Sequence, residues 1–128
     1  MSKKSGLVIV SLVVALLGYA LPALAADVTG ILVDEACYTK NKANTGNAHA
    51  GMSATCAQDC AKKGQQVAIV TKAGQVYEVM AMGDLAGANN AKLVPHMSHT
   101  VTLTGTVMDG AAGKPKMIHA TALTMVSK

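Results

Sequence analysis

Arginine, phenylalanine and tryptophan are absent from this sequence of 128 residues, and three tyrosines are its only aromatic side chains. Proteins that bind nucleic acids rely on arginine for bidentate contacts and on aromatic rings for base stacking. The composition therefore argues against a nucleic-acid partner. Charged residues make up only 14% of the chain against 51% hydrophobic residues, which excludes a disordered tail or a coiled coil. The length accommodates one domain and a short appendage.

Sequence motifs of several enzyme classes are missing as well. The chain has no Gly-x-Ser-x-Gly, no phosphate-binding loop and no dinucleotide-binding fingerprint. It also lacks Cys-x-x-Cys and Cys-x-x-Cys-His, which excludes a thioredoxin-type centre and covalent attachment of a c-type haem. The absence of these motifs favours a protein that is not an enzyme.

Residues 1–25 have the three-part pattern of a secretory signal peptide. Two lysines precede an apolar run over residues 7–17, and the small residues Ala23 and Ala25 mark a cleavage site. The apolar run is shorter than the roughly 20 residues of a transmembrane helix. The sequence thus predicts export to the periplasm or the extracellular medium. It also predicts a single mature domain over residues 26–128 without a membrane span.

Alternating hydrophobic residues and turn residues predict five β-strands in the mature chain. The expected strands are residues 28–33, 66–71, 75–82, 100–108 and 116–126. The clearest is 100–108, where valine and leucine alternate with threonine, so that one face is buried. Gly30 lies inside the first strand and indicates a bulge or a sharp bend there. The polar stretch 38–53 is expected to form a loop.

Two short helices are expected between these strands. Residues 56–63 follow Thr55, which forms a capping-box pattern with Gln58, and Gly64 stands where a helix would end. A second and weaker helix pattern covers residues 84–94 and is stopped by the proline that follows.

The resulting fold class is mainly β, a five-stranded β-barrel like an OB-fold. Apart from the helix over 56–63, the order is three strands, a short helix before the fourth strand, and two strands, as in OB-folds. The Cys-bearing helix over 56–63 would then be an insertion after the first strand. An α+β sandwich is the alternative architecture.

Three stretches of the chain resemble a group of small exported bacterial proteins. They are Asp-Glu-Ala-Cys at 34–37, Cys-Ala-Gln-Asp-Cys-Ala-Lys-Lys-Gly at 56–64 and Val-Thr-Leu-Thr-Gly at 101–105. The most specific part is the Cys-x3-Cys helix that ends in Lys-Lys-Gly. The resemblance implies an OB-like domain and export. It brings no catalytic residues, because most members of this group have no assigned activity.

Residues able to bind a soft metal ion are concentrated between the first and the last cysteine of the chain. On a helix, Cys56 and Cys60 share one face with their β-carbons about 5–6 Å apart. Both sulfurs can then bind one ion at about 2.3 Å, whereas a disulfide needs β-carbons about 3.5–4.5 Å apart. Cys37 and His49 would complete the site, with Met52 as a reserve thioether. The sequence predicts a copper(I) or zinc ion bound by Cys37, His49, Cys56 and Cys60.

A disulfide is the main alternative for the same three cysteines. Cys37 could pair with Cys56 or Cys60 and staple the inserted helix to the first strand, which would leave one free thiol. The chain would then be a structural or binding module that contacts an envelope protein or glycan through the face around the second and third strands. A reversible Cys56–Cys60 bridge would instead indicate a redox role. Cysteines that merely fill the apolar face of a packed helix are the simplest alternative.

Three further features have simpler structural interpretations. His96, Met97 and His99 could share a metal ion, although histidines in such turns are more often ordinary loop residues. Asp34 and Glu35 would point to opposite faces of a strand and are expected to be solvated. The methionines in predicted strands are expected to fill the core of a chain without phenylalanine. They are Met80, Met82, Met108, Met117 and Met125.

Overall fold

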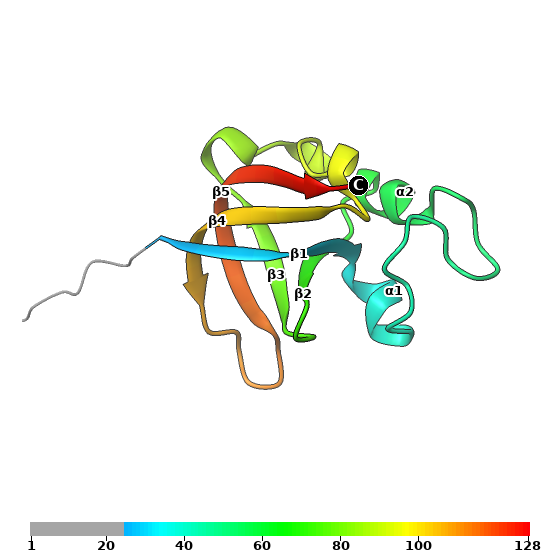
Figure 1. The fold of residues 1–128 in the computed structure, drawn as a ribbon, viewed down its shortest axis with the longest axis horizontal. Helices are drawn as coiled ribbons and strands as arrows, with labels where there is room; N and C mark the ends of the chain where they lie inside the picture. Colours follow the sequence, from blue (N-terminus) through cyan, green and yellow to red (C-terminus); the bar gives the residue numbers. More distant parts are fainter. Residues whose placement is uncertain (1–24) are drawn as a thin grey trace, which may run out of the picture.

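Five strands form a mixed sheet that closes in a ring in the computed structural model, which describes residues 25–128 (Figure 1). The strands are β1 (Ala26–Asp34), β2 (Val67–Thr71), β3 (Val76–Ala81), β4 (Thr100–Met108) and β5 (Lys116–Ser127). Around the ring their order is β1-β2-β3-β5-β4, with β3 and β5 parallel and the other neighbours antiparallel. The predicted signal peptide covers residues 1–25, and all of these except Ala25 lie outside the described residues.

The five predicted strands are confirmed, and β4 has its predicted bounds. Along β4, Val101 and Leu103 are buried inside the ring while the threonines that alternate with them face outward. On that outer face the hydroxyl of Thr102 lies 2.7 Å from the hydroxyl of Thr29 on β1. The period of two in the sequence therefore identified the two faces of this strand correctly.

The helical segments agree with the sequence in part. α2 (Cys56–Lys62) is confirmed and is followed by Gly64, whose φ of +82° is the left-handed conformation expected after a helix. The described part of the chain contains no helix that is long and apolar enough to cross a membrane. α1 (Glu35–Lys40) was not predicted, because the sequence indicated the end of a strand and a loop there.

The predicted helix over 84–94 is wrong. Three single turns of 3-10 helix replace it, namely η1 (Gly83–Leu85), η2 (Ala88–Asn90) and η3 (Val94–His96). Asn89 and Asn90 have φ values of 53° and 56°, which no continuous right-handed helix can contain. Asparagine tolerates this conformation better than most residues, so its local preference prevailed over the helical pattern.

Two glycines allow neighbouring strands to come very close where the ring curves. A β-carbon on Gly30 would overlap the carbonyl group of Val70 on β2, and one on Gly105 would overlap that of His119 on β5. The register between β4 and β5 also shifts next to Gly105. The expected bend at Gly30 is therefore a site of close backbone approach, which only glycine permits.

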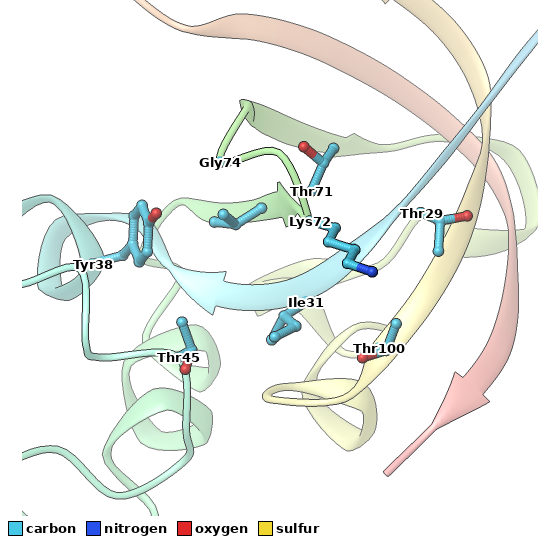
Figure 2. A pocket seen from close by; sticks show the side chains of 10 residues that line it. Thr29, Ile31, Tyr38, Thr45, Thr71, Lys72, Gly74 and Thr100 are labelled. Carbon is cyan, nitrogen blue, oxygen red and sulfur yellow. The ribbon is translucent and has the colours of Figure 1, made fainter.

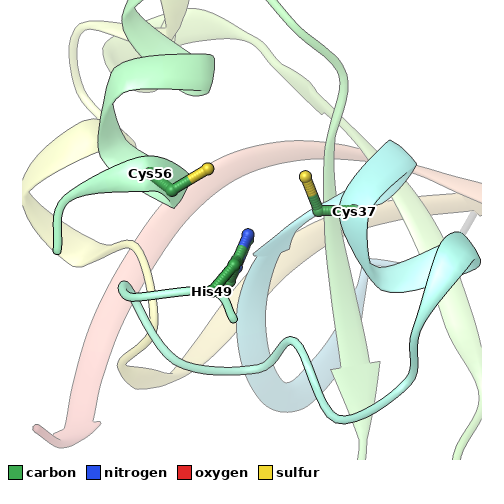
Figure 3. A group of neighbouring side chains, drawn as sticks. All are labelled: Cys37, His49 and Cys56. Atoms are coloured by element: carbon green, nitrogen blue, oxygen red, sulfur yellow. The ribbon is translucent and has the colours of Figure 1, made fainter. Parts of the chain in front are cut away.

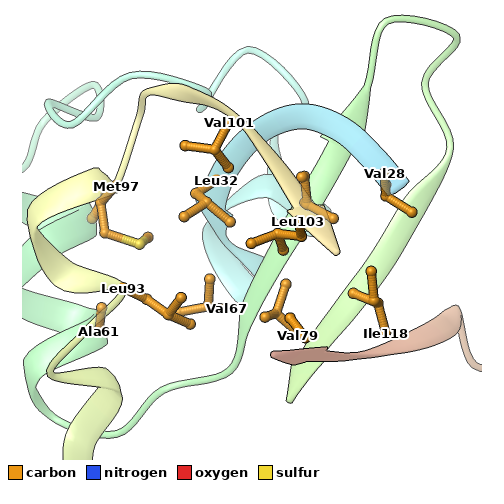
Figure 4. Close-up of a cluster of buried hydrophobic side chains, with 13 residues drawn as sticks. Val28, Leu32, Ala61, Val67, Val79, Leu93, Met97, Val101, Leu103 and Ile118 are labelled. Carbon is orange, nitrogen blue, oxygen red and sulfur yellow. The ribbon is translucent and has the colours of Figure 1, made fainter. Parts of the chain in front are cut away.

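The main core fills the inside of the ring and continues to one of its ends (Figure 4). Leu32, Leu103 and Ile118 are fully buried between the strands. Leu93 and Met97, from the segment before β4, cover the end of this core together with Ala57 and Ala61 of α2. Small alanines let α2 lie close to the sheet, so the helix that carries two cysteines is held at a fixed position.

Most strand methionines do not fill this core. Met80, Met82 and Met108 are exposed, which corrects the expectation that they replace phenylalanine inside the ring. On β3 the buried residue is Val79, and the alternation of a strand then turns Met80 outward. Leucine, isoleucine and valine fill the interior instead.

Candidate metal centre

Asp34 connects β1 to α1 and determines where Cys37 lies. It is the N-cap of α1, and its Oδ1 accepts a hydrogen bond from the backbone N–H of Cys37 at 2.8 Å. Asp34 is 2% exposed, so the expectation of a solvated carboxylate is wrong. Cys37 accordingly lies in the first turn of a helix rather than at a strand end, because this cap starts α1 immediately after β1.

The backbone of Cys37 is fixed at its carbonyl group as well. The backbone N–H of Asn41 and the side-chain amide of Asn44 both donate to the Cys37 oxygen at 3.0 Å. Together with the cap at Asp34, these bonds satisfy both polar groups of the Cys37 backbone. The thiol is therefore presented from a rigid turn although α1 has only six residues.

Asn47 holds the loop of His49 against the start of α2. Its main-chain oxygen accepts the N–H of Ala57, and its side-chain oxygen accepts the N–H of Gln58, each at 3.1 Å. The predicted capping box is wrong, because Thr55 makes no side-chain cap and its hydroxyl donates to Asp59 at 2.8 Å. A residue far along the loop thus supplies the cap, which fastens the loop to the helix.

Cys37, His49 and Cys56 converge between α1, the loop and α2 (Figure 3). One ligand atom from each of the three lies within 4.8 Å of the other two. The two sulfurs point toward one another, and the imidazole of His49 is directed at the gap between them. The predicted meeting of these three residues is therefore observed.

Cys60 joins the cluster through Cys37. Its sulfur, the Cys37 sulfur and a carboxylate oxygen of Asp34 also lie within 4.8 Å of one another. Two sulfurs on one tetrahedral ion lie about 3.8 Å apart, because each metal–sulfur bond is about 2.3 Å long. The sulfur pairs that include Cys37 therefore need to approach by about 1 Å or less to share an ion. Cys37 is the residue common to the two groups, because Cys60 is not grouped with His49 and Cys56. The cluster of Cys37, His49, Cys56 and Cys60 could therefore hold a metal ion.

The imidazole of His49 is oriented as in a metal ligand. The side chain is 5% exposed, and its Nε2 lies 3.1 Å from the carbonyl oxygen of Gly46. A carbonyl oxygen only accepts, so Nε2 carries the hydrogen and Nδ1 has the free lone pair. Among the described residues Nδ1 is buried and has no hydrogen-bond partner. A carbonyl on one nitrogen and a free lone pair on the other is the usual arrangement of metal-binding histidine.

The reserve ligand Met52 also lies at the cluster. The Cys56 thiol donates to the Met52 thioether with a sulfur–sulfur distance of 3.5 Å. Met52 itself is 60% exposed, whereas Cys56 is buried. An exposed thioether is thus in contact with a buried sulfur of the cluster.

Burial and the Asp34 carboxylate keep two of the thiols protonated. Burial, followed by the hydrogen bond and the negative charge of Asp34, raises the pKa of Cys37 to about 12. Burial and then the charge of Asp34 also raise the pKa of Cys60. At neutral pH both residues are neutral thiols, and all three cysteines are free. A metal ion would have to displace these protons.

Asp34 is the cluster residue that the sequence analysis did not identify. Its Oδ2 is buried next to the thiols of Cys37 and Cys60 and accepts no hydrogen bond from a nitrogen or oxygen donor among the described residues. A buried carboxylate oxygen whose neighbouring donors are only weak thiols is costly and needs an explanation. The available signal was the Asp-Glu pair directly after a strand, which is typical of a helix N-terminus.

The histidines near Pro95 lie outside this cluster. Met97 is 1% exposed and belongs to the core, so the suggestion that it binds metal beside His96 and His99 is wrong (Figure 4). The methionine that contacts His96 is Met125 of β5.

A second concave feature lies on the outer side of β1 and β2 (Figure 2). This pocket has a volume of about 560 Å³ and includes Tyr38 of α1, Thr45 of the loop and Thr100 of β4. Among residues 25–128, Lys72 is the only charged residue that lines it. The hollow is thus centred on the first two strands rather than on the second and third, which were expected to form the binding face.

No family model, curated protein or solved structure matches this chain. The arrangement of Cys37, His49, Cys56 and Cys60 is the feature of the molecule that points to a function.

Proposed function

We propose that this chain is an exported OB-like domain that binds one soft metal ion at the cluster, copper(I) in preference to zinc, without catalysis. Cys37, Cys56 and Cys60 would be the sulfur ligands and His49 the nitrogen ligand. The observation that carries the proposal is the convergence of Cys37, His49 and Cys56 within 4.8 Å, with a buried and unpartnered Nδ1 on His49. Export rests on the pattern of residues 1–25 and on the resemblance to small exported bacterial proteins.

The donor set supports copper(I) over zinc. Three thiolates and an imidazole suit either ion, so these four ligands alone do not discriminate. The Met52 thioether lies 3.5 Å from the Cys56 sulfur, and thioethers select copper(I). Because Met52 is exposed, its thioether would accept the ion first and pass it to the buried sulfur of Cys56.

Metal analysis and titration under anaerobic conditions test the proposal. The purified protein should contain copper or zinc, or should take up copper(I) tightly at the cluster. Cys60→Ser should abolish tight metal binding at the cluster. His96→Ala should leave the number of ions bound at the cluster unchanged. A protein that carries no metal and binds neither ion better than weakly would refute the proposal.

A disulfide-stapled binding module is the second candidate, and two observations favour it. The Cys37 sulfur lies within 4.8 Å of the Cys56 sulfur and of the Cys60 sulfur, so a small movement could close either bridge. The pocket beside Tyr38 could hold part of an envelope protein or glycan. Counting thiols before and after reduction separates the candidates. One free thiol in the oxidised protein would support the disulfide staple. Three thiols that react only after a chelator has removed the metal would support the metal centre.

A further inference from the structure

The turn from His96 to His99 has an unusual backbone that β1 holds in place. Ser98 has a φ of +70°, a left-handed conformation that costs energy in any residue with a side chain. Its N–H donates to the Leu32 oxygen at 2.8 Å, and the Leu32 N–H donates to the His99 oxygen at 3.1 Å. The neighbouring strand therefore enforces this turn. The two imidazoles are brought near each other, with ring centroids 6.4 Å apart.

A methionine from the last strand contacts this pair. Met125 on β5 is paired with Val101 on β4, just after the turn. Its sulfur lies 3.1 Å from Nδ1 of His96. Met125 is only partly buried and packs against the edge of the core rather than inside it. Met125 contacts His96, and the ring of His96 lies beside that of His99, so three soft or borderline donors are neighbours at one end of the sheet ring.

Polar atoms in this region lack partners in the described part of the chain. Nδ1 of His99 and the hydroxyl of Ser98 are buried without a hydrogen bond. Unsatisfied polar atoms beside a strained turn are typical of functional sites rather than of ordinary loops.

We infer that His96, His99 and Met125 form a second metal site, selective for copper(I). Imidazole nitrogens bind at about 2.0–2.1 Å, which places two ring centroids on a three- or four-coordinate ion roughly 5 to 5.5 Å apart. The observed 6.4 Å is about 1 Å longer, so the two rings would approach each other on binding. A nitrogen and a sulfur on one ion lie about 3.5 Å apart, so the contact between His96 and Met125 needs to lengthen by only a few tenths of an ångström. The hydrogen that Nδ1 of His96 donates to the sulfur in the metal-free protein would move to Nε2. The thioether excludes zinc as the preferred ion.

This site does not depend on the cysteine cluster, because it shares no residue with it. Copper(I) titration against a competing chelator, with methyl NMR of the unaltered protein, tests the inference. Addition of copper(I) should shift the methyl resonance of Met125, and zinc should leave it in place. The shift should persist in a Cys56→Ser/Cys60→Ser double variant, which keeps only this site.

Leucine matches methionine in size, so Met125→Leu removes the sulfur while retaining the packing. This variant should bind one copper(I) equivalent fewer than the unaltered protein, whereas Met80→Leu, on the exposed face of β3, should bind as many. An unmoved Met125 resonance at saturation, or an undiminished stoichiometry in Met125→Leu, would overturn the inference. A single equivalent that shifts Met125 and survives in the double cysteine variant would support this site and refute the proposed cluster function. The NMR measurement decides the question even if a variant fails to fold.

Discussion

Asn47 and Gln58 are joined by a hydrogen bond of 3.1 Å, in which the side-chain oxygen of Asn47 accepts the backbone N–H of Gln58. The bond starts α2, which carries Cys56 and Cys60. It also fixes the loop that carries His49, two residues after Asn47. One side chain thus sets the position of the nitrogen ligand relative to two sulfur ligands.

Replacing Asn47 with alanine should therefore weaken metal binding although every ligand remains. Loss of an N-cap side chain costs about 1 kcal/mol of stability. Loss of a group that orients metal ligands typically lowers affinity by roughly 10- to 100-fold. Denaturant unfolding of the metal-free protein and competition titration with copper(I) measure the two effects separately.

Thr55→Ala is the matched control for Asn47→Ala. The sequence pattern predicts Thr55 as the cap of α2, but its hydroxyl bonds to Asp59 and not to a backbone N–H of the helix. The control should therefore keep its metal affinity within about threefold, since its side chain orients no ligand. Equal losses of affinity in the two variants would contradict the role assigned to Asn47.

Asp34→Asn should lower the pKa of the Cys37 thiol. The Asp34 charge and hydrogen bond contribute to raising this pKa to about 12, after the larger effect of burial. Asparagine is as good an N-cap as aspartate, so α1 should persist while the negative charge is lost. The rate of Cys37 alkylation in a Cys56→Ser/Cys60→Ser background, followed against pH, gives the pKa directly.

Asp27→Asn is the control for this charge change, because Asp27 lies at the other end of β1 and bonds to Thr104. It should leave the pH profile of Cys37 alkylation unchanged. A profile that is the same with Asp34 and with asparagine would show that burial alone raises this pKa.

The strands could be predicted from the sequence because the pattern that indicates each strand lies within its own residues. In β4, alternating threonine and apolar residues indicate both the strand and its buried face. α1 could not be predicted in the same way, since six residues between a strand and a polar stretch give no helical period. The helix depends on Asp34, whose capping role becomes visible only once β1 is known to end there.

The soft ligands of the cluster were predictable, whereas the part of Asp34 and the geometry were not. The spacing of Cys56 and Cys60 and an unpaired third cysteine indicated the soft ligands. Nothing local places His49 beside them, because the side-chain bond from Asn47 to Gln58 of α2 spans 11 residues. The contact between His96 and Met125 spans 29 residues and depends on the pairing of β4 with β5. Contacts of this range follow from the closed sheet rather than from any sequence motif.

Leu103→Ala should strongly destabilise the domain. Leu103 is fully buried at the centre of the ring, and removing such a side chain from a core costs about 2–5 kcal/mol. Val126→Ala, at an exposed position on β5, should change stability by less than about 0.5 kcal/mol. Urea unfolding midpoints of the two variants provide the comparison. Similar midpoints would contradict the position assigned to the core.

The affinity of the cluster for copper(I) should rise with pH. Cys37, with a pKa of about 12, holds its proton across the neutral range, and Cys60 also has a raised pKa. Each proton that the metal displaces makes the apparent affinity about tenfold higher per pH unit, as long as the pH stays below the pKa of that thiol. Between pH 6 and pH 8, displacement from Cys37 alone should therefore strengthen binding by about 100-fold. Competition titrations at three pH values measure this slope, and proton release on metal addition checks it independently. If the affinity did not change with pH, the thiols would not be the ligands, because displacement of a thiol proton makes the affinity depend on pH.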